Sequence, residues 1–169
     1  MTANEIFARL PADESSGILG WLQENDKPAY KASISLLAGR RKLRPIFVER
    51  KPRDERHAWM AAALTKPANA DAATEILQAW ILGGNRPMVL EFLEALGVSH
   101  EDGIIEDLPA EPTEGKVRAA VDALFAKYPT AAVVVYLNLF VSMDVTEWPV
   151  LRGLVASDER FQLAPANVG

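Results

Sequence analysis

Six prolines divide most of the chain into apolar segments of helical length. Proline lacks a backbone N–H and restricts the residue before it, so it begins a helix far more readily than it continues one. The six prolines are Pro28, Pro45, Pro67, Pro87, Pro129 and Pro149. We expect each of them to mark the start of a helix, which predicts an all-α fold.

Apolar residues recur at helical spacing between these prolines. Val117, Val121 and Leu124, for example, share one face of a helix. The pattern predicts nine helices, over residues 12–25, 28–38, 44–50, 54–65, 70–82, 86–96, 114–127, 130–143 and 149–157. The predicted core residues are Ile76, Leu77, Trp80, Phe92, Leu93, Val134, Leu137 and Phe140.

Polar residues and glycines at the ends of these segments predict helix caps. N-caps are expected at Asp26, Asn85, Thr113 and Thr146, because their side chains can accept a free backbone N–H. Helix ends are expected at Gly39, Gly83 and Gly97. A small hairpin over residues 98–106, turning at Asp102 and Gly103, is the only strand signal.

The helices group into three units of three, over residues 12–50, 54–97 and 114–157. Pro67 and Pro87 are 20 residues apart, as are Pro129 and Pro149, and the stretch LAGRRKLRPIFVE echoes ILGGNRPMVLE. This punctuation resembles the HEAT and armadillo class of helical repeats. The length of 169 residues predicts a single domain, 1–169. The resemblance implies that it folds as a short α-solenoid whose inner surface binds a partner. It carries no catalytic residue across.

An acidic inserted loop, residues 98–113, interrupts this regular array, and a compact helical bundle stays an alternative fold. The wider stretch 99–115 holds six acids and no base. It is interpreted as a solvated loop, with partner binding or a divalent cation site as alternatives. Glu111 and Glu114 are expected to favour the dipole of the following helix.

The 169 residues include no cysteine, which excludes disulfides and thiolate chemistry and fits a cytoplasmic location. The longest apolar run, AAVVVYLNLFV over 131–141, is about half the ~20 residues that cross a bilayer. We interpret it as a buried helix and expect no membrane as a partner.

Reactive groups are sparse. The two histidines, His57 and His100, lack metal-ligand spacing, and His57 is expected in a plain surface or boundary role. Neither a glycine-rich phosphate loop nor a Gly-x-Ser-x-Gly elbow occurs. No catalytic residue, cofactor or metal site is therefore predicted.

Two successive turns over residues 40–56 are strongly basic. Their cations are Arg40, Arg41, Lys42, Arg44, Arg50, Lys51, Arg53 and Arg56. They are interpreted first as a solvated or internally paired surface. As alternatives, they form the candidate partner-binding surface for a protein or other anionic partner, or bind nucleic acid. Phe47, which could stack on bases, is assigned to the core instead.

These features favour a non-catalytic protein-interaction or scaffold module. Nucleic-acid or other polyanion binding through the basic turns is the alternative, and a small enzyme of unknown reaction is the second. Residues 1–66 carry 12 Lys and Arg against 8 acids, and residues 67–169 carry 6 against 15. Attraction between these halves makes a homo-oligomer a further alternative.

Overall fold

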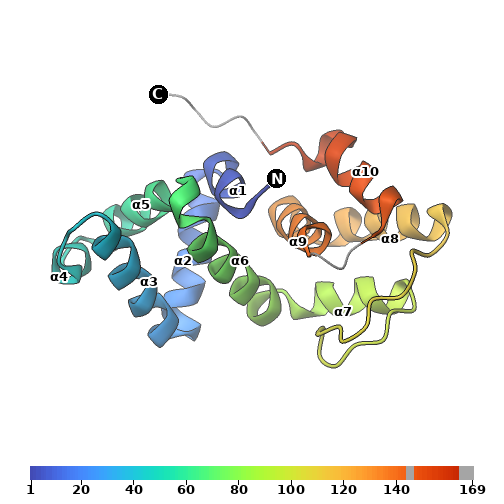
Figure 1. Ribbon diagram of the computed structural model, residues 1–169, viewed down its shortest axis with the longest axis horizontal. Coiled ribbons are helices and arrows are strands. Elements are labelled where there is room, and N and C mark those ends of the chain that lie inside the picture. Colours follow the sequence, from blue (N-terminus) through green and yellow to red (C-terminus); the bar gives the residue numbers. More distant parts are fainter. Residues whose placement is uncertain (144–146, 164–169) are drawn as a thin grey trace. The chain divides into compact units, whose positions relative to one another are not determined.

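The computed structural model describes residues 1–143 and 147–163, which form an all-α fold (Figure 1). Ten α-helices and two short 3-10 helices occur in these ranges, and no strand does. The elements are α1 (Ala3–Arg9), α2 (Ala12–Asn25), α3 (Lys27–Arg40), α4 (Pro45–Glu49), α5 (Arg53–Leu64), η1 (Pro67–Asn69), α6 (Ala70–Gly84), α7 (Arg86–Ala95), α8 (Glu114–Lys127), α9 (Thr130–Ser142), α10 (Pro149–Ser157) and η2 (Glu159–Phe161). The predicted fold class is confirmed.

Every one of the six prolines stands at the beginning of a helix, as predicted. They occupy the first position of α4, η1 and α10, the second position of α3 and α7, and the N-cap of α9. The first-turn amides of a helix have no intrahelical acceptor, so the missing N–H leaves nothing unpaired. The nine predicted helices begin and end within two residues of the observed bounds.

Helix α1 was not predicted. Its first turn is closed by Glu5, whose Oε2 accepts the Thr2 backbone N–H at 2.8 Å. Ile6 and Phe7 are buried. The Thr-x-x-Glu spacing at residues 2–5 is the sequence pattern of a capping box, and it is the signal that could have revealed this helix.

The predicted helix ends are only partly confirmed. Gly97, with a φ of 69°, ends α7 as predicted. The predicted helix ends at Gly39 and Gly83 are wrong, because these two glycines lie inside α3 and α6. The left-handed residue after α3 is Lys42, at a φ of 56°. Its N–H donates to the Gly39 carbonyl at 3.0 Å and that of Leu43 donates to the Ala38 carbonyl at 2.9 Å, which closes the helix.

Three of the four predicted N-caps stand where expected. Asp26 accepts the Ala29 N–H at 3.2 Å. Asn85 and Thr113 occupy the N-cap positions of α7 and α8. Thr146 lies outside the described residues.

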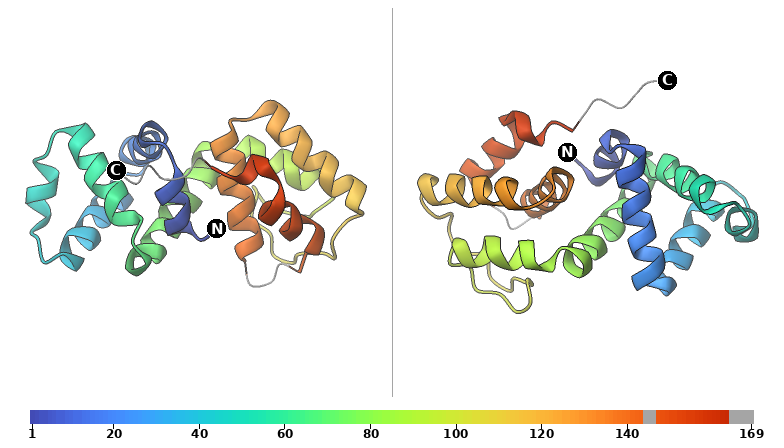
Figure 2. Two further views of the ribbon diagram at one scale, coloured as in Figure 1. Left: turned by 90° about the horizontal axis from the view of Figure 1, so that it is seen from above. Right: turned by 180° about the vertical axis from the view of Figure 1, so that it is seen from behind.

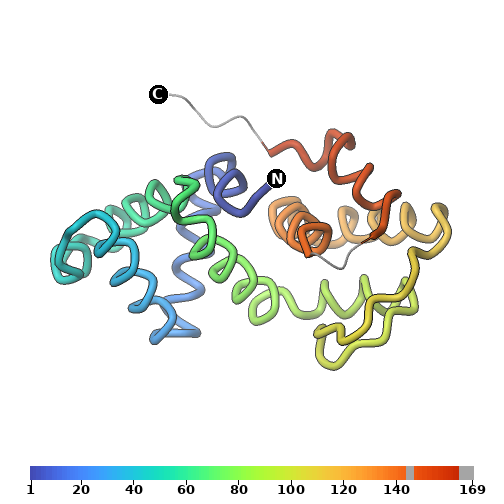
Figure 3. The backbone as a smooth tube through the Cα atoms, viewed as in Figure 1, coloured from blue at the N-terminus to red at the C-terminus, as the bar shows by residue number. Residues whose placement is uncertain are grey.

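The predicted hairpin over 98–106 reduces to a two-residue turn. Glu101 and Ile104 exchange both backbone hydrogen bonds at 2.9 Å, and Asp102 and Gly103 between them have positive φ angles. A Cβ at Gly103 would lie 3.0 Å from the Val89 side chain, so the loop packs closely on α7 (Figure 3). Within the described part of the chain the pairing extends no further.

The described chain divides into two compact units, Met1–Trp80 and Ile81–Leu163, here called unit 1 and unit 2. The boundary falls inside α6, which runs across it without a break, and within the second expected repeat unit, 54–97. The single domain and the solenoid of three three-helix units therefore stay predictions.

Unit 1 is built around α2, which contacts α3 and α5 (Figure 2). Its fully buried side chains include Ile18 and Leu19 of α2, Leu37 of α3 and Met60 of α5. The short helix α4 contacts α3 and α5. Figures 1 and 2 both show it at one end of this unit.

Unit 2 centres on α9, the apolar run seen in the sequence. Helices α8 and α10 contact it, and every residue from 131 to 138 is buried. The Phe92 ring lies edge-on to Tyr136 and Phe140, with centroids 5.6 and 5.7 Å apart. Seven of the eight predicted core residues are buried, while Trp80 is only half-buried.

Candidate binding surfaces

Three of the eight predicted site residues are held by the protein itself, and Arg40 is held most firmly. Its guanidinium binds Asp71 through two hydrogen bonds, of 2.9 and 2.8 Å, and the Ala68 carbonyl at 2.7 Å. This pairing holds the pKa of the Asp71 carboxyl far below its usual range. Arg40 therefore ties the end of α3 to the start of α6 and is not free to bind a partner.

Arg56 and Arg53 are also engaged. The Arg56 side chain donates to the Tyr30 hydroxyl at 2.7 Å and to the backbone carbonyls of Glu49 and Lys51 at 3.1 and 3.2 Å. Arg53 lies over Gly20 of α2 and contacts Glu24 at 3.4 Å. Arg56 thus connects α5 to the backbone at the end of α4.

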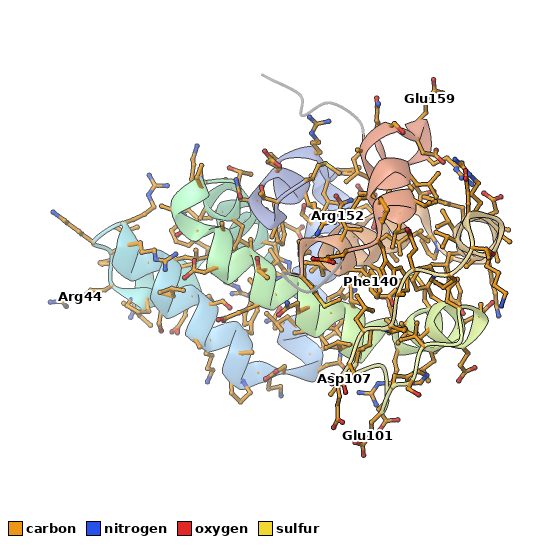
Figure 4. The ribbon with its side chains drawn as sticks, turned by 45° about the vertical axis from the view of Figure 1, so that its right-hand side comes forward. Arg44, Glu101, Asp107, Phe140, Arg152 and Glu159 are labelled. Atoms are coloured by element: carbon orange, nitrogen blue, oxygen red, sulfur yellow. The ribbon has the colours of Figure 1, made fainter. Side chains whose placement is uncertain are left out.

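The side chains of the other five cations form no hydrogen bond or ion pair with any described residue. They are Arg41, Lys42, Arg44, Arg50 and Lys51, and they lie on the two turns that flank α4. Figure 4 shows the Arg44 side chain extending away from the ribbon. These five cations therefore flank one short helix, and they differ from Arg40, Arg53 and Arg56 in that their side chains have no partner among the described residues.

Apolar side chains are exposed among these cations. Phe47 is 59% exposed, Ile46 42% and Leu43 41%, while Val48 is completely buried. The assignment of Phe47 to the core is wrong: α4 has only five residues, so a single face of it reaches the core. We call residues 41–51 the tip.

The tip is held in one conformation from both sides. The Lys42 and Leu43 amides close α3 on its first side, and Arg56 binds two carbonyls on its second side. An ordered surface loses less conformational entropy on binding than a mobile one. The tip is thus an exposed basic and apolar surface that hydrogen bonds tie to the helices on both of its sides.

The acidic loop is fastened to unit 2 rather than free. Trp148 Nε1 donates to the Pro109 carbonyl at 2.9 Å. Both oxygens of Glu111 accept the first amides of α10, from Val150 at 3.1 Å and Leu151 at 2.9 Å. The expectation that Glu111 serves the following helix is wrong, because it caps α10.

The outer acids of this loop form no metal centre. Glu101 and Asp107 point away from the ribbon (Figure 4), and the Nδ1 atom of His100 accepts the Gly103 amide at 3.1 Å. Among the described residues, no group of three or more His, Asp and Glu side chains could hold a metal ion.

His57 is buried, with 1% of its surface exposed, so its expected surface or boundary role is wrong. Its Nδ1 lies 3.0 Å from the Ser16 hydroxyl and its Nε2 lies 3.1 Å from the Tyr30 hydroxyl. Burial, with further contributions from the Arg53 and Arg56 charges, lowers the pKa of His57, so the imidazole is neutral at pH 7.

The Ser16–His57 pair is arranged for structure rather than for catalysis. Arg56 donates to the Tyr30 hydroxyl, so Tyr30 has its own proton to give, and His57 Nε2 is the acceptor at hand. In the tautomer that accepts from Tyr30, the imidazole proton lies on Nδ1, and this N–H donates a hydrogen bond to the Ser16 hydroxyl. A ring that donates to the serine does not take its proton, so Ser16 is not activated as a nucleophile.

An open groove of about 840 Å³ runs along the same region of unit 1. It lies between the end of α1, the start of α2 and one face of α5. Its apolar lining comes from Phe7, Leu10, Pro11, Ala12, Ala58, Ala61 and Ala62. Sequence reasoning missed this groove, although the alanines of α5 recur at helical spacing within RHAWMAAAL.

Comparison with protein-family models, with curated proteins and with solved structures finds no match to this chain. Across residues 1–143 and 147–163, no helix combines the length and the apolar character needed to cross a membrane.

Proposed function

We propose that the protein is a non-catalytic scaffold that binds an α-helix of a protein partner in the groove of unit 1. The observation that carries this proposal is an open apolar groove floored by exposed alanines. Ala58 and Ala62 of α5 are exposed, and Ala61 between them is half-buried. Small side chains allow a second helix to approach closely.

The chemistry of the groove fits an amphipathic helix. Phe7 and Leu10, both largely buried, form the apolar base of the groove, while Arg9, Asp13 and Asp54 are its charged lining residues. A helix with an apolar face and charged flanks is the ligand that such grooves recognise, through anchors at positions i, i+3, i+4 and i+7. In the tautomer inferred above, Ser16 accepts a hydrogen bond from His57, which is consistent with a binding role for the groove.

A cytoplasmic location belongs to the same proposal. The cysteine-free composition suits a reducing compartment. We also propose the solenoid-like stacking of helices as the framework that holds the groove open.

Affinity capture from the native cell tests the groove. The full chain is compared with Ala62→Arg, which places a long charged side chain in the groove, and with Ala119→Arg, the same change at an exposed alanine of α8. We expect the first variant to lose the specific partner proteins and the second to retain them. Equal capture by both variants would overturn the proposal, provided that circular dichroism shows both to be folded.

Polyanion binding through the tip is the second candidate function. It is favoured by the five cations whose side chains have no partner among the described residues. If four of them neutralise phosphates of duplex DNA, the logarithm of the affinity falls with the logarithm of salt concentration at a slope of about −3.6. Titration with a labelled duplex at two salt concentrations measures this slope. An affinity that does not change with salt would contradict binding through phosphates.

A further inference from the structure

We propose that the tip attaches the protein to the surface of an anionic phospholipid membrane. The five cations of the tip contact headgroup phosphates, while Phe47, Ile46 and Leu43 enter the boundary between headgroups and acyl chains. This proposal goes beyond the groove and does not depend on it. It requires no membrane-spanning helix.

Charge complementarity is the first argument. Arg41, Lys42 and Arg44 precede α4 and Arg50 and Lys51 follow it, so cations surround the apolar side chains. Glu49 is the one acid within residues 41–51. Each cation near an anionic lipid surface raises the affinity by about fivefold. These five cations are available because their side chains bind no described residue, whereas Arg40, Arg53 and Arg56 bind other residues of the protein.

The exposed apolar side chains decide between a membrane and nucleic acid. A phosphate backbone would use the cations but would leave Ile46 and Leu43 in water, because aliphatic chains neither stack on bases nor bind phosphate. A bilayer boundary accepts both the aromatic and the aliphatic side chains while the cations stay at the headgroups. The composition of the tip therefore favours lipid.

The position of the tip decides between a membrane and a protein. Helix α4 stands at one end of unit 1 (Figures 1 and 2). Its Ile46 and Phe47 side chains are exposed. A protein partner would need a hollow shaped to receive this end, whereas lipids rearrange around a projecting side chain. The acidic composition of residues 67–169 opposes any general attraction to an anionic surface, so attachment must come from the tip itself.

Vesicle flotation of the full chain tests this inference. Phosphatidylcholine vesicles with and without phosphatidylserine are compared at low and high salt. We expect binding only with phosphatidylserine, and weaker binding at high salt because ions screen the attraction. Arg41→Glu with Arg44→Glu should weaken binding at least about tenfold, and Ile46→Ser with Phe47→Ser should also weaken it.

Two controls keep the test specific. Lys66→Glu with Lys116→Glu makes the same charge change at exposed positions outside the tip and should bind like the wild type. Ala62→Arg fills the groove and should also leave flotation unchanged, so failure of either proposal is seen separately. Absence of flotation, or flotation indifferent to Ile46 and Phe47, would overturn the inference. So would tighter binding to duplex DNA that depends on the cations alone.

Discussion

Two glycines that looked alike in the sequence have opposite structural roles. Gly97 is left-handed and closes α7, whereas Gly39 lies within α3 and a Cβ there would meet nothing within 4 Å. We expect Gly97→Ala to lower the free energy of unfolding by about 1 kcal/mol. Gly39→Ala should raise it by up to about 1 kcal/mol, because alanine favours a helix interior. Urea unfolding of both variants checks this, and the same sign at both positions would contradict it.

Glu111 illustrates a residue whose role no local pattern reveals. It caps α10 from about 40 positions earlier in the chain, at 3.1 and 2.9 Å from two amides. Glu111→Ala should therefore lower the free energy of unfolding by about 1–2 kcal/mol. Glu101→Ala, at an exposed acid of the same loop, is the matched control and should change little. Equal effects at the two positions would show that the cap does not contribute.

His57 predicts a pH dependence of stability. Burial lowers its pKa in the folded protein, so the unfolded state binds the proton more readily. Stability is therefore complete at neutral pH and declines as the pH falls below the ordinary histidine pKa of about 6.5. His57→Gln removes this titration while keeping a polar side chain. Thermal unfolding of both proteins between pH 7.5 and 5.5 should show a steeper loss for the wild type, and parallel curves would contradict the buried neutral ring.

At the scale of elements, the helices could be predicted because their starts are local events. Proline acts through its own missing N–H, and cap residues act within one turn, so both are visible in a short stretch. Helix α1 was not predicted because no proline marks its start, which is signalled only by a capping box. The candidate surfaces were harder to predict: Arg40 is occupied by Asp71, 31 residues away, and the groove needs α1, α2 and α5 together.

Helix α9 offers a test of packing at this scale. Leu137 is completely buried, while Leu139 on the same helix is half-buried. Leu137→Ala should lower the free energy of unfolding by about 2–5 kcal/mol, through lost transfer energy and the cavity left behind. Leu139→Ala should lower it distinctly less. Similar losses in urea unfolding would mean that the helical phase of α9 is wrong.

At the scale of the whole molecule, we propose that two surfaces of unit 1 bind two kinds of partner. The groove presents exposed alanines and suits a protein helix, and the tip presents cations around apolar side chains and suits an anionic lipid surface. The Ser16–His57 pair is satisfied by internal hydrogen bonds. We propose a scaffold that holds a partner protein at a membrane.

Site-directed photocrosslinking tests the central claim, which is that the groove binds a protein. A photoreactive amino acid replaces Ala62 in the groove or Ala119 on α8, and the full chain is irradiated in its native cell. The account predicts a discrete protein adduct from position 62, abolished by a second change, Ala58→Arg, and no such adduct from position 119. Identical adducts from both positions, or none from position 62, would contradict it.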